Sequence, residues 1–182
     1  MTANRVRIIG GQWRSRIIRF PPAIQIRPTP DRVRETLFNW LGQRLDGRSC
    51  LDLFAGSGAL GFEALSRGAS RVVMVERERK AADALRESAK LLDARDAEVR
   101  DGDALDYLKR STQTFDVVFI DPPFASDLAA RCLARLAPRL NPGARVYVES
   151  AEALILTPPW RALREDRAGA VRYALLEHAP EQ

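Results

Sequence analysis

Residues 51–61 read Leu-Asp-Leu-Phe-Ala-Gly-Ser-Gly-Ala-Leu-Gly, an apolar run that leads into a loop with three glycines. These glycines fit the G-x-G-x-x-G pattern, in which a strand passes through a tight turn into a helix. Glu76 follows about 20 residues later, where the pattern places an acid that binds a ribose diol. A turn that needs glycine only for packing has the same letters, so the neighbouring elements must decide between the two interpretations.

Strand and helix patterns alternate from residue 49 onward. Runs such as Phe-Asp-Val-Val-Phe-Ile at 115–120 are apolar on both faces, as in a parallel sheet covered by helices on both sides. Two later strand patterns flank Gly169 and predict an antiparallel hairpin at the end of the sheet. The sequence therefore predicts a doubly wound, Rossmann-like α/β fold. The expected strands are 50–55, 71–76, 97–100, 115–120, 144–149, 161–167 and 171–177, and the expected helices are 59–67, 78–92, 103–110 and 127–137.

Acidic residues stand at the carboxyl ends of the predicted parallel strands. Ligands of open α/β sheets bind beyond these strand ends. Four successive strands carry such an acid, namely Asp52, Glu76, Asp103 and Asp121. One acid at a strand end is common, but the same placement on four strands in a row is much less so. We therefore expect these side chains to surround one binding site.

The glycine loop allows two cofactors, because NAD and S-adenosylmethionine both contain an adenosine ribose that an acid can bind. Asp52 lies close to the loop and suits an ammonium group better than a phosphate, while loop N–H groups can hold a carboxylate. Asp103 is placed to accept a hydrogen bond from an adenine amino group. These features favour S-adenosylmethionine, and an NAD-dependent oxidoreductase stays as the alternative.

Residues 121–124 read Asp-Pro-Pro-Phe directly after the fourth predicted strand. A carboxylate and a backbone carbonyl that proline holds in place can grip both N–H groups of an exocyclic amine and aim its lone pair at a methyl donor. Phe124 offers a face on which a flipped-out base can stack. Asp-Pro is also common in plain turns. Together with the glycine loop, however, the motif indicates methylation of a nucleobase amine.

Positive charge is concentrated in the N-terminal quarter. Residues 1–48 hold ten arginines and three acidic residues, a net charge of +7, whereas residues 49–182 have a net charge of −2. Arginine suits a polyanion such as RNA, and solvated surface charge is the alternative.

Two β-branched runs around Gly10-Gly11 predict a hairpin over 5–20. Thr29 is expected to cap a helix whose first residue is Pro30.

Composition excludes several classes of protein. The 182 residues are enough for one domain of ordinary size. No apolar run reaches the about 18 residues of a membrane span. The first residues do not resemble a secretory signal, so we expect a cytoplasmic protein. A single histidine and two separate cysteines do not provide a hydrolase triad, a metal centre or a disulfide framework.

The motifs together resemble a known family. Residues 121–124 resemble the (Asn/Asp)-Pro-Pro-(Tyr/Phe) motif of amino-group methyltransferases, and residues 51–61 resemble their cofactor motif. Gly11-Gln-Trp-Arg14, the segment from Arg27 to Trp40, and Tyr147-Val-Glu-Ser150 narrow the resemblance to the RsmD family, over nearly the whole chain. That family methylates the N2 amine of a guanine in bacterial 16S ribosomal RNA.

The resemblance implies a fold and a set of roles. The fold is that of S-adenosylmethionine-dependent methyltransferases, a mostly parallel sheet of seven strands with an antiparallel last strand. The implied contacts to S-adenosyl-L-methionine come from Asp52, Phe54, Ala55, Gly56, Ser57, Gly58, Glu76, Asp103, Ala104 and Asp121. The implied catalytic contacts to the target base come from Asp121, Pro122, Pro123 and Phe124. The residues expected to face RNA are Trp13, Arg14, Arg16, Arg27, Thr29 and Arg32.

The expected substrate is 16S ribosomal RNA within the small ribosomal subunit or an assembly intermediate, bound by a monomer without a metal. We divide the chain into a basic N-terminal hairpin appendage, 1–26, and a methyltransferase domain, 27–182. An adenine-N6 methyltransferase acting on RNA or DNA uses the same four-residue motif and stays as an alternative, as does an RNA-binding module without catalysis. Glu63 and Glu149 are assigned to supporting polar roles.

Overall fold

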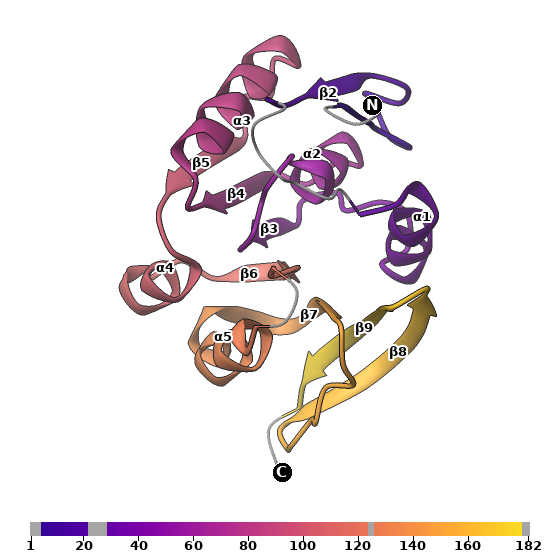
Figure 1. Cartoon of the computed structure of the whole chain (residues 1–182), viewed down its shortest axis with the longest axis vertical. Helices are drawn as coiled ribbons and strands as arrows, with labels where there is room; N and C mark the ends of the chain where they lie inside the picture. The colour runs from indigo at the N-terminus through magenta and orange to yellow at the C-terminus, as the bar shows by residue number, and fades with distance from the viewer. Residues whose placement is uncertain (1–4, 22–28, 124–125, 180–182) are drawn as a thin grey trace.

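The computed structural model describes residues 5–21, 29–123 and 126–179. The strands are β1 (Arg5–Arg7), β2 (Ile17–Arg19), β3 (Ser49–Asp52), β4 (Arg71–Glu76), β5 (Ala97–Asp101), β6 (Phe115–Ile120), β7 (Leu140–Ser150), β8 (Trp160–Ala168) and β9 (Val171–His178). The helices are α1 (Asp31–Trp40), α2 (Ala59–Ser66), α3 (Arg79–Leu91), α4 (Ala104–Arg110) and α5 (Leu128–Leu136), followed by the short 3-10 helix η1 (Ala137–Arg139). Figure 1 shows these elements as a layered α/β fold.

The main sheet has the strand order β5-β4-β3-β6-β7-β9-β8. Strands β3 to β7 are parallel, and β9 runs antiparallel to both of its neighbours. The predicted fold class and its antiparallel last strand are therefore confirmed. From β3 the chain proceeds to β4 and β5 on one side, and later to β6 and β7 on the other. This reversal between β3 and β6 is the point at which open α/β sheets bind ligands.

Two apolar cores lie on the two faces of the sheet (Figure 1). On one face, α1, α2 and α3 contribute Phe38, Phe62 and Leu85. On the other face, α4 and α5 contribute Leu108 and Leu133. Strands that are covered on both faces must be apolar throughout, which explains the unbroken apolar runs in the sequence.

The N-terminal hairpin is packed into this fold. Its strands are shorter than predicted, and the connection over residues 8–16 is correspondingly longer. Ile8 and Ile18 are buried in the same core as α1 and α2. Gly11 has a φ of +77°, and a Cβ there would lie 1.8 Å from the backbone oxygen of Ser66, so only glycine allows this approach to the end of α2. The division into 1–26 and 27–182 stays a prediction.

Two local predictions need correction. Strand β3 ends at Asp52 rather than at residue 55, because the chain turns at residues 53–54 toward the glycine loop. The expected capping of α1 by Thr29 is wrong, since Pro30 is the N-cap residue and no side chain caps this helix. The Thr29 hydroxyl bonds instead to carboxylates from the sheet. No helix in the described part of the chain is both long and apolar enough to span a membrane.

Candidate active site

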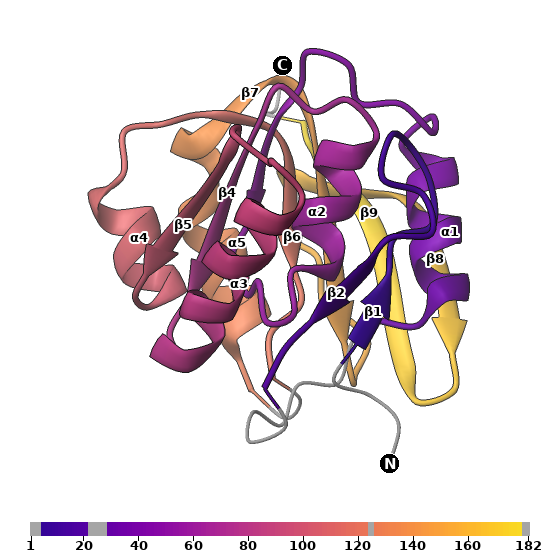
Figure 2. The same cartoon turned by 90° about the horizontal axis from the view of Figure 1, so that it is seen from above.

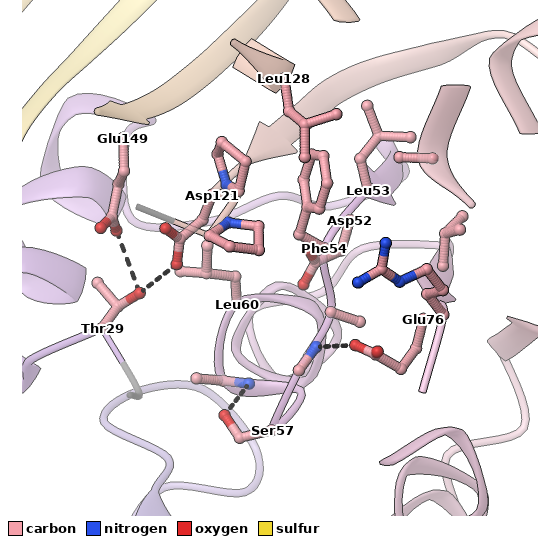
Figure 3. Close-up of a pocket in the computed structure, with 18 of the residues that line it drawn as sticks. Thr29, Asp52, Leu53, Phe54, Ser57, Leu60, Glu76, Asp121, Leu128 and Glu149 are labelled. Atoms are coloured by element: carbon pink, nitrogen blue, oxygen red, sulfur yellow. Dashed lines mark hydrogen bonds between the residues drawn. The ribbon is translucent and has the colours of Figure 1, made fainter. Parts of the chain in front are cut away.

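A pocket of about 840 Å³ opens at the carboxyl ends of β3, β4 and β6 (Figure 3). The four acids expected from the strand ends, Asp52, Glu76, Asp103 and Asp121, all line it. So do the predicted site residues Thr29, Phe54, Ala55, Gly56, Ser57, Ala104, Pro122 and Pro123. The structure thus brings the predicted cofactor and catalytic residues together. Two exceptions are Gly58, which is not among the lining residues, and Phe124, which lies outside the described residues.

The glycine loop positions the carboxylate of Glu76. The Gly56 N–H donates to Glu76 Oε2 at 2.8 Å, and the Glu78 N–H donates to Oε1 at 2.8 Å. Both oxygens are therefore held at the tip of β4 (Figure 3). Gly58 serves packing instead, because a Cβ there would lie 2.5 Å from the Phe62 ring and its φ is +82°. The packing interpretation of the glycine pattern is therefore correct for Gly58, and a cofactor contact of Gly56 stays a prediction.

Asp52 is a buried acceptor with spare capacity. Only 1% of its surface is exposed, and its Oδ1 has no hydrogen-bond partner in the described part of the chain. Burial raises the pKa of Asp52 to about 7. A buried carboxyl oxygen without a donor is costly, and an ammonium group entering the pocket would both supply the donor and favour the charged form. The pocket therefore fits the amino-acid end of S-adenosylmethionine.

Asp103 has a structural role beside its predicted one. Its Oδ1 accepts from the N–H groups of Leu105 at 2.8 Å and Asp106 at 3.2 Å, so the residue caps α4. Oδ2 has no such partner among the described residues. Capping fixes the carboxylate and with it the position of Oδ2, and the expected contact of this oxygen with an adenine amino group stays a prediction.

Asp121 follows β6 directly and lines the pocket. The Thr29 hydroxyl lies 3.3 Å from Asp121 Oδ2 and 3.1 Å from Glu149 Oε1 (Figure 3). Tyr147 donates its hydroxyl to the same Glu149 oxygen at 2.8 Å. Burial, followed by the negative charges of Glu149 and Asp52, raises the pKa of Asp121 well above its ordinary value. The motif aspartate is thus a stronger proton acceptor than a surface aspartate.

The two prolines leave one backbone carbonyl available. Ser126 donates its hydroxyl to the Pro123 carbonyl at 2.8 Å. The Pro122 carbonyl accepts no hydrogen bond from the residues that the structure describes. This oxygen is adjacent to Asp121 in the chain, so the expected pair of acceptors for an exocyclic amine consists of the Asp121 carboxylate and the Pro122 carbonyl.

Comparison with known proteins agrees with this geometry. The family described as "Conserved hypothetical protein 95" matches residues 6–177. The ribosomal RNA small subunit methyltransferase D of Haemophilus influenzae is 42% identical over 183 residues, which are 96% of this chain and 95% of that protein. The protein of the same name from Escherichia coli K12 is 42% identical over 180 residues, 96% of this chain and 91% of that protein.

The chain belongs to the RsmD family. The family resemblance predicted from the motifs is therefore confirmed. A solved structure of a proposed methyltransferase from Escherichia coli superimposes with a TM-score of 0.89 at 40% identity, over 97% of this chain and 99% of that one. The methyltransferase fold expected for an RsmD-family chain is confirmed as well.

The predicted RNA-facing residues of this RsmD-family chain do not gather at the pocket. The Gln12 N–H donates to the carbonyl of Ser66, the last residue of α2, and Arg16 donates to the carbonyl of Leu91, the last residue of α3. Helix α3 starts beside the pocket and has 13 residues, a length of about 20 Å. The hairpin turn thus lies near the amino end of β4 (Figure 2), whereas the pocket lies at the carboxyl ends of the parallel strands.

The individual residues of this group differ. Trp13 packs partly buried against the core, Arg14 is exposed, and the Arg16 side chain bonds to α3. Arg32 is exposed on the first turn of α1. Arg27 lies outside the described residues. Among the described members of the group, only Thr29 lines the pocket, with 6% of its surface exposed. Their contacts to RNA stay predictions.

A buried charge network was missed by sequence reasoning. The Glu63 carboxylate, inside the apolar helix α2, accepts from the hairpin N–H groups of Ile9 at 2.9 Å and Gly10 at 2.8 Å. It also pairs with Arg34 at 3.2 Å and Arg67 at 2.9 Å. Glu63 and Arg34 are 0% and 1% exposed. A glutamate within the otherwise apolar Ala-Leu-Gly-Phe-Glu-Ala-Leu was the only signal, and most of its partners are more than 25 residues away in the sequence.

Proposed function

We propose that this protein transfers a methyl group from S-adenosylmethionine to the exocyclic N2 amine of a guanine in 16S ribosomal RNA. The observation that supports this most is the placement of Asp121 and the free Pro122 carbonyl in one pocket with Asp52 and Glu76, within the part of the chain that the structure describes. A cofactor site and a pair of amine acceptors thereby open into the same space, as methyl transfer requires.

The cofactor would be held by four groups. Asp52 would bind its ammonium group, Glu76 its ribose hydroxyls and Asp103 its adenine amino group. The Ser57 N–H, which donates to none of the described residues, would bind its carboxylate. When bound, the cofactor supplies an electrophilic methyl group on a sulfonium. The three carboxylates also favour a cation over an anion in this pocket, which speaks against the pyrophosphate of NAD.

The target amine would be held by two acceptors. Asp121 accepts from one N–H and the Pro122 carbonyl from the other, so that the nitrogen lone pair is turned out of the base plane toward the methyl group. The raised pKa of Asp121 suits it to take the proton that the nitrogen loses after methylation. Stacking on Phe124 would hold the base in the pocket.

The relatives' names support the choice of substrate, because two of them at 42% identity are named ribosomal RNA small subunit methyltransferase D. We extend this to 16S RNA within the small subunit or an assembly intermediate. A cytoplasmic location and a monomeric state stay predictions.

The proposal is tested by incubating the protein with labelled S-adenosylmethionine and small subunits that lack the modification, followed by nucleoside analysis. We expect N2-methylguanosine. N6-methyladenosine would replace the proposal by the adenine alternative, and no labelled nucleoside would reject methyl transfer to this RNA.

The exposed Arg14 tests whether the hairpin turn contacts RNA. If its guanidinium binds a phosphate, Arg14→Ala should weaken binding similarly for all sequences and reduce the slope of log K against log salt by about one. Titrations at several salt concentrations measure this slope. The matched control is Arg131→Ala, an exposed arginine of α5 on the other face of the sheet. Equal slopes for Arg14→Ala and the unmodified protein would exclude a phosphate contact at this position.

A further inference from the structure

The pocket holds two carboxyls that rely on hydroxyl groups rather than on basic residues. Within residues 5–21, 29–123 and 126–179, no arginine or lysine forms an ion pair with Asp121 or Glu149. Their donors are the hydroxyls of Thr29 and Tyr147. A buried carboxylate without a cation is normally avoided, so the arrangement calls for a reason beyond stability.

The Thr29 hydroxyl has one proton and two acceptors. It lies 3.1 Å from Glu149 Oε1 and 3.3 Å from Asp121 Oδ2, and a hydroxyl can donate to only one of them at a time. Tyr147 already donates to the same Glu149 oxygen. Asp121 turns Oδ2 toward Thr29, and its carboxyl group also lies within hydrogen-bonding reach of the Glu149 carboxyl.

Thr29 is held in place by the buried charge network. Arg34 Nε donates to the Thr29 carbonyl at 3.2 Å, and the same guanidinium pairs with Glu63. Arg34 is 1% exposed, so its position is set by the core. Thr29 belongs to no helix or strand, but the bond from Arg34 to its carbonyl fixes its backbone and thereby the position of its hydroxyl beside Asp121.

We propose that Thr29 and Glu149 are positioning residues for Asp121. Thr29 fixes the rotation of the carboxyl group that accepts from the substrate amine. Glu149 competes for the same hydroxyl proton, and its negative charge controls whether Asp121 is ionised. This inference rests on the proposed function in one respect, namely that Asp121 accepts from the amine.

The charged groups around Asp121 determine the direction of each effect. Asp121 is influenced by Asp52 from β3, by Glu149 from β7 and by the Thr29 hydroxyl from the segment before α1. Tyr147 donates a hydrogen bond to Glu149, and Tyr173 of β9 packs on Tyr147. Glu149 and Asp52 raise the pKa of Asp121, whereas the hydrogen bond from Thr29 lowers it. Removing the charge of Glu149 should therefore lower this pKa, and removing the Thr29 hydroxyl should raise it.

The test is a carbon-13 NMR titration of the Asp121 carboxyl in the cofactor-free protein, with the signal assigned by its loss in Asp121→Asn. Glu149→Gln should shift the midpoint to lower pH by about one unit or more. Thr29→Val should shift it upward, and Thr29→Ser, which keeps the hydroxyl, should titrate like the unmodified protein. Glu152→Gln, exposed just after β7, is the control and should leave the midpoint unchanged.

The pH dependence of kcat/KM for methyl transfer gives the second readout. Its acidic limb should move in the same direction as the midpoint in each variant, whereas a purely structural role would lower the rate at every pH without moving the limb. Coinciding midpoints for Glu149→Gln and the unmodified protein would overturn the inference. If Glu149→Gln does not fold, the inference is overturned when Thr29→Val and Thr29→Ser have the same midpoint. Failure of the unmodified protein to methylate RNA would reject the proposed function, while the NMR titration would still decide the inference.

Discussion

Replacing Asp121 with alanine lowers methyl transfer to RNA by at least about 100-fold, because the amine loses the acceptor that orients it and takes its proton. Asp121→Asn should lose only about tenfold, since an amide oxygen still accepts one N–H, although more weakly than a carboxylate. Single-turnover rates with bound cofactor measure both effects. The control is Asp106→Ala, an exposed aspartate on α4 outside the pocket, which should keep the full rate.

Asp121→Ala and Asp121→Asn should also make the cofactor-free protein more stable. The pKa of Asp121 is raised in the folded state, so folding favours its protonated form and the charged carboxyl opposes folding. This cost is absent below the unfolded pKa of about 3.9 and grows as the pH rises above it. Asp121→Asn should therefore raise the unfolding temperature at pH 8 but not at pH 3. Rapid methylation by Asp121→Ala, or a lower unfolding temperature of Asp121→Asn at pH 8, would contradict our assignment.

Removing the carboxylate of Glu63 destabilises the protein by about 3–5 kcal/mol, because buried Arg67 loses its counter-ion and buried Arg34 keeps only the half-exposed Asp31. Arg34 and Arg67 lose their shared partner, and the N–H groups of Ile9 and Gly10 lose their acceptor. This loss is a large part of the about 5–15 kcal/mol by which a typical domain is stable. Chemical denaturation of Glu63→Ala measures it.

The matched control is Glu35→Ala, an exposed glutamate on α1, for which we expect a change of at most about 0.5 kcal/mol. The hairpin should also become a substrate for trypsin near Arg14 and Arg16 in Glu63→Ala, because the docking of its turn onto α2 is weakened. A loss below about 1 kcal/mol would mean that the network contributes little net free energy.

The N-terminal hairpin illustrates why deletion is a poor test of RNA binding. Its residues Ile8 and Ile18 belong to the main core, and its backbone satisfies Glu63. Removal of the segment would expose apolar surface and unpair buried charges before it revealed any RNA contact. Single substitutions of exposed arginines keep the fold and therefore answer the question more directly.

The sequence by itself determined the fold class and most of the pocket. Strand and helix periodicity are local, and in a parallel sheet all carboxyl ends meet at one edge. For this reason, acids that follow successive strands could be assigned to one site from their positions in the sequence. The glycine pattern predicted the turn from neighbouring residues, and the strand-helix-strand order placed Glu76, 20 residues later, at the end of the next strand.

Only the tertiary structure decided which polar groups pair across long sequence distances. Thr29 looked like a helix cap, because a threonine before a proline and an aspartate satisfies the local rule. Its hydroxyl bonds instead to Glu149, 120 residues away. Likewise, Glu63 finds its hairpin partners more than 50 residues earlier, and the turn with Trp13 and Arg14 docks at the end remote from the pocket. Such pairings depend on how the chain packs, and a one-dimensional pattern does not contain that information.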